Sequence, residues 1–430
     1  MWCWARRSPP RPALRNGRPS LPNPRCPVPI WWPRCGAFWP ARQTAEMPRS
    51  APDKAAVLAR AAALQQAFVG AGAAPLHLPV LQPAEALLDL YGEDIRARAY
   101  VTSDPVLGEQ MLRPDFTVPV AQRHMATHQA QPGGAPACYT YLGEVFRRQE
   151  TAQRGRANEY LQVGYERFGD TDPAEADARV FALFAGLLAP LGLRPALGDI
   201  GLLRAAVAGL GTSPARKAAL MRHLWRPRRF RALLDRFAGR SAPLPSRVAL
   251  LGAVAGQGVE AVLDAAGPEI GQRGRAEVAR RIAALQADAQ EPPIPAAQVA
   301  LLDDLMALRE TCPNALAHLS NIAVDMPAIL PALMRLEARL AALSARGIDV
   351  DTLDFEASYG RTTMEYYDGF VFGFMVPGRP DLPPVASGGR YDALTRVLGQ
   401  ANGQGAGVPA VGGVIRPELV VALEAGEGAR

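Results

Sequence analysis

The sequence predicts an α+β fold in which a mostly antiparallel sheet is flanked by helices and interrupted by a helical insertion domain. Alternating apolar and polar residues mark strands at 138–147 and 159–168, and strand character returns at 352–357 and 364–376. Between these two groups, from about residue 203 to 345, the chain is rich in Ala, Leu and Arg, as is typical of helices. Strands that bracket a run of helices indicate a sheet domain with an inserted helical domain.

Turn and capping residues predict where several elements begin and end. Asp53 predicts one helix start, and Asp172-Pro173-x-Glu175 predicts another whose helix closes at Gly192. Asp104-Pro105 predicts a turn between two short strands. Further along, Asp368-Gly369 predicts a hairpin inside 364–376, and a short helix is expected at 84–91.

The first 46 residues differ in composition from the rest of the chain. They hold ten of the 40 prolines, five of the six tryptophans and eight arginines, but no helical or strand period and no secretory apolar run. Two interpretations stay open: untranslated upstream sequence, with Met47 as the true start, or a disordered tail with a targeting or binding role. We therefore expect an extension at 1–46, a sheet domain at 47–202 and 349–430, and an insertion at 203–348.

The charge balance of the remaining chain gives no reason to expect nucleic-acid binding. The net charge of +6 comes from the extension, because 39 basic and 40 acidic residues remain without it. No uninterrupted apolar stretch reaches the roughly 18 residues of a membrane span, so no membrane is expected. Cys138 and Cys312 are the only cysteines beyond the extension, and two cysteines so far apart in the sequence do not make a disulfide framework. We therefore expect a reducing cytoplasm.

Three further patterns favour a structural interpretation over a chemical one. The sequence has no Gly-Lys pair, so it contains no Walker loop, and no cofactor is predicted. His124 and His128 have a spacing that can chelate zinc, but no third ligand is near, so we expect a solvated helix face and no metal. Residues 216–240 carry ten basic side chains with Trp225 and Phe230 interleaved. We favour a helix pair with a basic outer face over nucleic-acid binding.

The informative residues are polar groups on the expected strands, in a particular order. They are Arg113-Pro-Asp115-x-Thr117, Phe146-Arg147, Gln162-x-Gly-x-Glu166, Glu365-Tyr366-Tyr367 and Ser387-Gly-Gly-Arg390-Tyr391-Asp392. Each alone could line the solvent face of a sheet. In combination they resemble histidyl-tRNA synthetase: LRPDFT is similar to its LRPExT segment, and FRRQ with RGRANEYLQVGYE is similar to its motif 2. TTMEYYDGFVF and SGGRYDAL are similar to segments specific to the histidine branch. The resemblance covers about 50–200 and 350–420.

The resemblance implies a class II aminoacyl-tRNA synthetase-like fold and a histidine site. Carried over by position, the residues expected around the ligand are Asp115, Thr117, Arg147, Gln162, Glu166, Tyr366 and Tyr367. Their chemistry suits histidine. Carboxylates and Thr suit the ammonium group, Glu166 and a tyrosine hydroxyl suit the ring nitrogens, and Arg147 suits the carboxylate or a phosphate.

The sequence departs from the synthetase pattern at two catalytic positions. Thr362 stands where the family's catalytic arginine belongs, and Leu419 stands where its ATP-anchoring arginine belongs. Arg361 lies one residue from the first position, which on a strand points to the opposite face. Arg416 lies three residues from the second and could compensate only if the segment shifts. Because each such group typically contributes ~10²–10³ in rate, we expect negligible adenylation and no enzyme activity.

This pattern resembles the regulatory-subunit family of ATP phosphoribosyltransferase, which acts at the first step of histidine biosynthesis. The resemblance implies a short catalytic subunit as partner in a hetero-oligomer, L-histidine as feedback ligand and a self-dimer through the synthetase-like core. The alternatives are a divergent histidine-activating enzyme that uses Arg361 and Arg416 in new roles, a truncated histidyl-tRNA synthetase, and an RNA-binding stress sensor that uses residues 216–240.

The extension at 1–46 has no apolar period with which to pack on the rest of the chain. A chain that begins at Met47 is therefore expected to match the full chain in folding and melting temperature. Thermal unfolding of both proteins by circular dichroism tests this. A fall of more than roughly 4 °C, worth about 1–2 kcal/mol in a large domain, would show that the extension packs.

Overall fold

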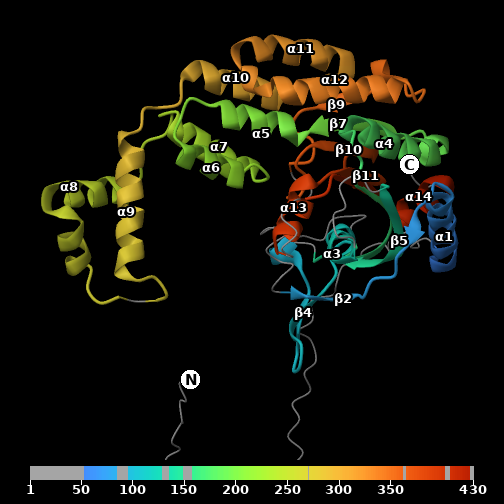
Figure 1. Ribbon diagram of the computed structural model, residues 1–430, viewed down its shortest axis with the longest axis horizontal. Coiled ribbons are helices and arrows are strands. Elements are labelled where there is room, and N and C mark those ends of the chain that lie inside the picture. Colours follow the sequence, from blue (N-terminus) through green and yellow to red (C-terminus); the bar gives the residue numbers. More distant parts are fainter. Residues whose placement is uncertain are drawn as a thin grey trace, which may run out of the picture. The chain divides into compact units, whose positions relative to one another are not determined.

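The computed structural model in Figure 1 describes residues 53–84, 95–127, 135–148, 157–269, 271–361, 365–401 and 407–426. The extension at 1–46, His128, Thr362 and all of the expected helix at 84–91 except Ala84 lie outside these residues. Residues 51–430 form one compact unit.

The core of this unit is a nine-stranded, mostly antiparallel sheet, as the alternating segments predicted. Its order is β1-β5-β6-β12-β11-β10-β7-β9-β8, and only the pairs β1–β5 and β7–β9 are parallel. The strands are β1 (Ala74–Pro75), β5 (Ala137–Phe146), β6 (Glu159–Phe168), β7 (Arg194–Asp199), β8 (Arg309–Thr311), β9 (Asp354–Glu356), β10 (Phe370–Met375), β11 (Ala386–Arg390) and β12 (Ala410–Ile415).

A small second sheet has the order β2-β4-β3, with β2 at Leu81–Pro83, β3 at Val101–Asp104 and β4 at Gly108–Leu112. The expected turn after Asp104 joins β3 to β4. The Oδ1 of Asp104 accepts hydrogen bonds from the backbone N–H groups of Val106 and Leu107, both at 2.8 Å. This arrangement is the side-chain mimicry of a backbone turn for which Asp is favoured.

Helices cover the sheet and fill the stretch between β7 and β9. Outside that stretch lie α1 (Lys54–Gly70), α3 (Thr117–Thr127), α4 (Pro173–Leu188), α13 (Asp392–Ala401) and α14 (Pro417–Glu424). Within it lie α5 (Ile200–Gly209), α6 (Pro214–Arg222), α7 (Pro227–Phe237), α8 (Pro245–Ala265), α9 (Arg275–Gln290), α10 (Ala296–Ala307), α11 (Cys312–Asp325) and α12 (Leu330–Ser344). Short 3₁₀ turns span Pro327–Ile329 and Val350–Thr352 within this stretch and Ala189–Leu191 before it. The Ala-, Leu- and Arg-rich composition that begins near residue 203 thus predicted the helices. The domain boundaries at 203 and 348 stay a prediction.

The expected helix starts are confirmed by their capping bonds. The Asp53 side chain accepts a hydrogen bond from the N–H of Ala55, and the Asp172 side chain accepts from the N–H groups of Ala174 and Glu175. The second helix, α4, ends at Leu188, earlier than expected. A 3₁₀ turn continues it to Leu191, and Gly192 closes that turn at φ 58°, a left-handed conformation that glycine adopts without a Cβ penalty.

The hairpin expected at Asp368-Gly369 is wrong. Among the described residues 365–376, only Phe370–Met375 is a strand, and it pairs with β7 on one side and β11 on the other. Asp368 is held instead by tertiary contacts, because its backbone N–H donates to the carbonyl of Arg390 at 3.0 Å and its side chain accepts from the N–H of Ala393 at 2.9 Å. The Asp-Gly signal therefore marks the approach to a central strand.

A buried ion network ties the helices to the sheet. The carboxylate of Asp177 on α4 accepts hydrogen bonds from Arg390 at the end of β11, at 2.7 and 2.9 Å, and from Arg339 on α12 at 2.9 Å. Arg339 also reaches Asp199 at the end of β7, at 3.0 Å. All four side chains are buried. Helix α12 packs on α4, and α4 packs on β11 and β12 (Figure 1).

Helix α8 has the length and composition of a membrane span and is mostly exposed. Gly258, however, interrupts it with φ 82° and ψ 164°, far from helical values. The helical pieces on either side of this glycine are each shorter than the roughly 20 residues that cross a bilayer.

The Asp177 network generates a stability prediction. Asp177→Asn removes the buried carboxylate that both guanidinium groups share and leaves Arg339 with Asp199 and Arg390 with Asp392, and we expect it to lower the free energy of unfolding by about 3–5 kcal/mol. Asp354→Asn, which removes the partner of the exposed Arg194, should cost under about 1 kcal/mol. Urea unfolding of both variants is the measurement. Equal losses would contradict a structural role for the buried network.

Candidate functional site

A cavity of about 580 Å³ is lined by residues of β6, β11 and β12, by Arg147 directly after β5, by the start of α3 and by the segment that precedes β10. We call it the large cavity. Six of the seven residues predicted for the ligand site line it: Asp115, Thr117, Arg147, Gln162, Tyr366 and Tyr367. Asp115 and Tyr366, which are in contact here, are 251 positions apart in the chain.

One wall of the large cavity is built around Asp115. The hydroxyl of Tyr366 donates to its Oδ2 at 3.1 Å, and the guanidinium of Arg147 lies 4.0 Å from the same oxygen. Arg147 is held in place because its Nε donates to the carbonyl of Pro114 at 2.6 Å. Burial raises the pKa of Tyr366 well above its usual range, so this phenol stays neutral and remains a donor.

A second wall carries an unsatisfied acceptor. Gln162 on β6 is 1% exposed, and its Oε1 has no hydrogen-bond partner within the described part of the chain. A buried polar oxygen without a partner costs roughly 1–3 kcal/mol. A ligand with an N–H group would satisfy this oxygen, so the site is suited to an ammonium or imidazole donor.

Glu166 does not line the large cavity. It is fully buried, with Oε1 accepting from Thr117 at 2.8 Å and from Tyr141 at 2.9 Å, and Oε2 accepting from Tyr391 at 2.7 Å. The backbone of β12 closes over it, since a Cβ on Gly412 would lie 1.6 Å from Oε2. Glu166 therefore supports Thr117 from below, and its contact with a ligand stays a prediction.

The pKa of Glu166 is raised to about 7, because burial disfavours the charged form, while the three hydroxyl donors oppose that shift. Tyr141 reaches this carboxylate only because Gly164 has no side chain. A Cβ there would lie 2.1 Å from the tyrosine ring. Thr117 belongs to both groups of residues, since it lines the large cavity and donates to Glu166.

Comparison with known proteins identifies the family. The histidyl-tRNA synthetase family profile matches residues 49–291 and 257–418. The ATP phosphoribosyltransferase regulatory subunits of Agrobacterium fabrum and Rhizobium johnstonii are each 35% identical to this chain, over 81% and 80% of it and 92% of each relative. The chain belongs to the ATP phosphoribosyltransferase regulatory subunit family.

Solved structures share the fold of this regulatory-subunit chain. An ATP phosphoribosyltransferase regulatory subunit/histidyl-tRNA synthetase from Bacillus halodurans has a TM-score of 0.59 at 19% identity, covering 87% of this chain and 81% of that one. A histidine–tRNA ligase subunit from Alicyclobacillus acidocaldarius has a TM-score of 0.53 at 24% identity, covering 91% and 99%. The synthetase-like fold expected from the motifs is confirmed.

The two arginines near the synthetase's catalytic positions have different locations in this chain. Arg361 lies in a turn, not on a strand, and points into the helices: its Nε donates to the carbonyl of Leu224 at 2.9 Å, and its guanidinium lies over the ring of Phe230. Arg416 lines the large cavity beside Leu419 and donates to the carbonyl of Pro384. Arg361 is thus removed from the site, whereas Arg416 belongs to it.

Sequence reasoning missed several residues of the large cavity, including Arg98, Tyr160 and Glu418. Tyr160 could have been found, because it precedes Gln162 by two positions on the same strand and therefore shares its face. The location of Glu418 in the cavity could not be predicted from the sequence, because it depends on tertiary structure. Its Oε1 accepts from the N–H of Leu161 at 2.6 Å, a contact across 257 positions.

The expectation of a solvated face at His124 is wrong. His124 is 5% exposed, stacks on Phe168 with ring centroids 4.3 Å apart and lies 3.1 Å from the hydroxyl of Tyr139 through Nδ1. The His124 ring therefore packs between α3 and the strands β5 and β6, which carry Tyr139 and Phe168. The described ranges contain no group of three or more residues placed to hold a metal ion.

The helix pair expected at 216–240 is confirmed as α6 and α7, but its outer face is less basic than expected. Arg231 and Arg240 pair with Asp303 at 2.7 and 3.3 Å, and Arg216 pairs with Asp288 at 2.6 Å. Three of the ten basic side chains are therefore paired with acidic side chains of α9 and α10.

The raised pKa of Glu166 generates a pH prediction. The folded protein binds this proton more tightly than the unfolded chain, whose glutamate ionises near its usual 4.5. The wild type should therefore lose up to roughly 3 kcal/mol relative to Glu166→Gln as the pH rises from about 4.5 to about 7. Urea unfolding of both proteins at several pH values is the measurement. The exposed Glu310→Gln is the control, and a pH-independent difference for Glu166→Gln would contradict the assignment.

Proposed function

We propose that this chain is the non-catalytic partner of a short ATP phosphoribosyltransferase catalytic subunit and that its large cavity binds L-histidine as the feedback signal. The name shared by relatives at 35% identity supports the regulatory role. The observation that carries the ligand is the meeting of six predicted polar residues in one cavity.

Each part of histidine has a chemical counterpart in the large cavity. Asp115 and the unsatisfied Oε1 of Gln162 are acceptors for the ammonium group or for an imidazole N–H. Arg147 supplies a planar fork for the carboxylate. The neutral hydroxyl of Tyr366 can donate to a ring nitrogen or keep its bond to Asp115. The large cavity thus offers acceptors for the ammonium group and a cationic donor for the carboxylate, as a zwitterionic amino acid requires.

The non-catalytic role rests on the cations that adenylation needs. Such chemistry requires preorganised positive charge at the reacting carboxylate and phosphates, and each group typically contributes ~10²–10³ in rate. Arg361, the cation nearest the first catalytic position in sequence, is bound to the carbonyl of Leu224. Arg416 does line the large cavity, and this observation keeps a divergent adenylating enzyme as the second candidate.

Feedback by histidine requires that the ligand binds active and inhibited assemblies with different affinity. In this proposal the chain forms a hetero-oligomer with the catalytic subunit and a dimer with itself through the synthetase-like core, in the cytoplasm. The two cysteines of the described chain, Cys138 and Cys312, are free thiols, in agreement with a reducing compartment.

Asp115→Asn tests the ligand site. Removing the charge from a 2% exposed carboxylate that lines the large cavity should weaken histidine binding about ten- to hundredfold, the usual contribution of a charge-assisted hydrogen bond. Calorimetric titration with histidine measures this. Asp325→Asn, at an exposed position at the end of α11, is the matched control and should bind as the wild type does.

Two further measurements separate this function from its rival. ATP–pyrophosphate exchange with histidine should be undetectable, and robust exchange would restore the synthetase. In the reconstituted complex, Asp115→Asn should need correspondingly more histidine to inhibit phosphoribosyl transfer, while activity without histidine stays nearly unchanged. Superimposable inhibition curves from equally stable proteins would locate the sensor elsewhere.

A further inference from the structure

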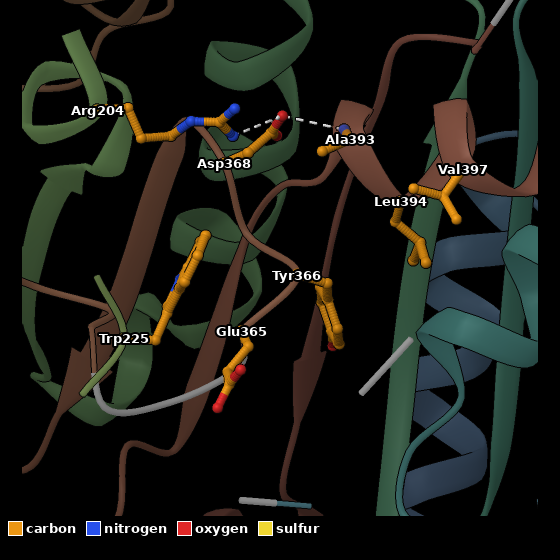
Figure 2. A pocket seen from close by; sticks show the side chains of 8 residues that line it. All are labelled: Arg204, Trp225, Glu365, Tyr366, Asp368, Ala393, Leu394 and Val397. Atoms are coloured by element: carbon orange, nitrogen blue, oxygen red, sulfur yellow. Dashed lines mark hydrogen bonds and ion pairs between the residues drawn. The ribbon is translucent and has the colours of Figure 1, made fainter. Parts of the chain in front are cut away.

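A second, smaller cavity of about 190 Å³ shares a wall with the large cavity, because Tyr366 lines both (Figure 2). We call it the Trp225 cavity. It lies where α5 and the connection between α6 and α7 meet the segment before β10 and helix α13. Apart from Tyr366, no residue of the proposed histidine site lines it.

The Trp225 cavity contains two carboxylates. Asp368 is paired through one oxygen, which accepts from the N–H of Ala393 at 2.9 Å and lies 3.3 Å from the guanidinium of Arg204 (Figure 2). Its other oxygen is buried and has no hydrogen-bond partner among the residues that the structure describes. Glu365, the second carboxylate, lies 3.4 Å from Arg226. Burial raises the pKa of Asp368 to about 6, so an additional donor at this carboxylate would stabilise its charged form.

The remaining walls are aromatic and aliphatic. Trp225 and Tyr366 supply rings, while Leu394 and Val397 of α13 supply aliphatic surface, with Val397 49% exposed. Acidic groups next to aromatic faces and an apolar surface suit a cation carried on a methylene stem. Arginine and lysine side chains have this composition.

The size of the Trp225 cavity favours a side chain over a free metabolite. Small-molecule sites usually enclose ~300–1,000 Å³, and the affinity available to a ligand is limited by its number of atoms. A group that fills about 190 Å³ binds usefully when the rest of an interface holds it in place. Buried arginines beside tryptophan and tyrosine are typical energetic centres of protein interfaces.

We propose that the Trp225 cavity receives one arginine or lysine side chain of the protein partner, with its stem on Leu394 and Val397 and its charged head beside Trp225, between Asp368 and Glu365 (Figure 2). Only the identity of that partner, the catalytic subunit, rests on the proposed function. The hydroxyl of Tyr366 donates to Asp115 in the large cavity, so the docked side chain and the histidine ligand contact the same tyrosine. Partner docking and ligand binding are coupled through that side chain.

Trp225 provides a direct reporter. In the full chain with Trp2, Trp4, Trp31, Trp32 and Trp39 replaced by Phe, Trp225 is the only tryptophan. Titration with N-acetyl-L-arginine methylamide should change its emission saturably at millimolar concentration, and N-acetyl-L-norleucine methylamide should not. No response to the arginine derivative, or an equal response to both, overturns the proposal.

The second arm uses the complex with the catalytic subunit. Complex formation should change Trp225 emission, and Glu365→Gln should weaken the complex about tenfold, as the loss of one charge-assisted bond predicts. Glu310→Gln, an exposed glutamate on β8, is the matched control and should leave the affinity unchanged. Full affinity in Glu365→Gln with silent Trp225 emission overturns the docking proposal. Failure of any complex to form, with a normal response to the arginine derivative, overturns the proposed function and leaves the cation cavity standing.

Discussion

The shared carboxylate of Asp177 is the interaction on which the rest of the structure depends. It is fully buried, and burial raises its pKa even beside Arg339 and Arg390. Removing three or more charges from water is costly, so the network is tolerable only because each carboxylate oxygen accepts good hydrogen bonds. With α4, α12 and the ends of β7 and β11 fixed in this way, the strand ends can carry side chains to defined positions.

Both cavities inherit their geometry from these strand ends. Arg390 is fixed toward Asp177, and the next residue, Tyr391, delivers its hydroxyl to Glu166 beneath the large cavity. At the end of β7, Asp199 binds Arg339 and also accepts from the N–H of Gly201, which starts the helix that carries Arg204 to the Trp225 cavity. One buried network thus positions the floor of one cavity and a wall of the other, because rigid strands transmit position to both of their faces.

Local patterns in the sequence predicted most of the strands, and a period of two places Gln162 and Glu166 on one face of β6. The candidate site residues came from the resemblance to histidyl-tRNA synthetase, and six of them line the large cavity. These patterns did not predict how deeply each side chain is buried. The carboxylate of Glu166 is covered by the backbone at Gly412, which belongs to a strand distant in sequence. The same limit explains the misjudged His124, whose helix face is covered by Phe168, and the absent hairpin at Asp368, whose bonds go to Arg390 and Ala393. Patterns report periodicity, whereas burial is a property of the assembled sheet.

In the proposed function, Tyr366 is the residue that would connect ligand binding to partner docking. A ligand shifts an equilibrium only by its difference in affinity between two states, and a side chain that contacts both ligand and partner is one way to produce that difference. Tyr366 has the position for this proposed role, because its hydroxyl binds Asp115 in the large cavity and the same residue lines the Trp225 cavity. Its phenol stays neutral, so its interaction with either cavity is a directional hydrogen bond or ring contact rather than a long-range charge. In the proposed coupling, a displacement of this one ring changes contacts in both cavities, because Tyr366 lines each of them.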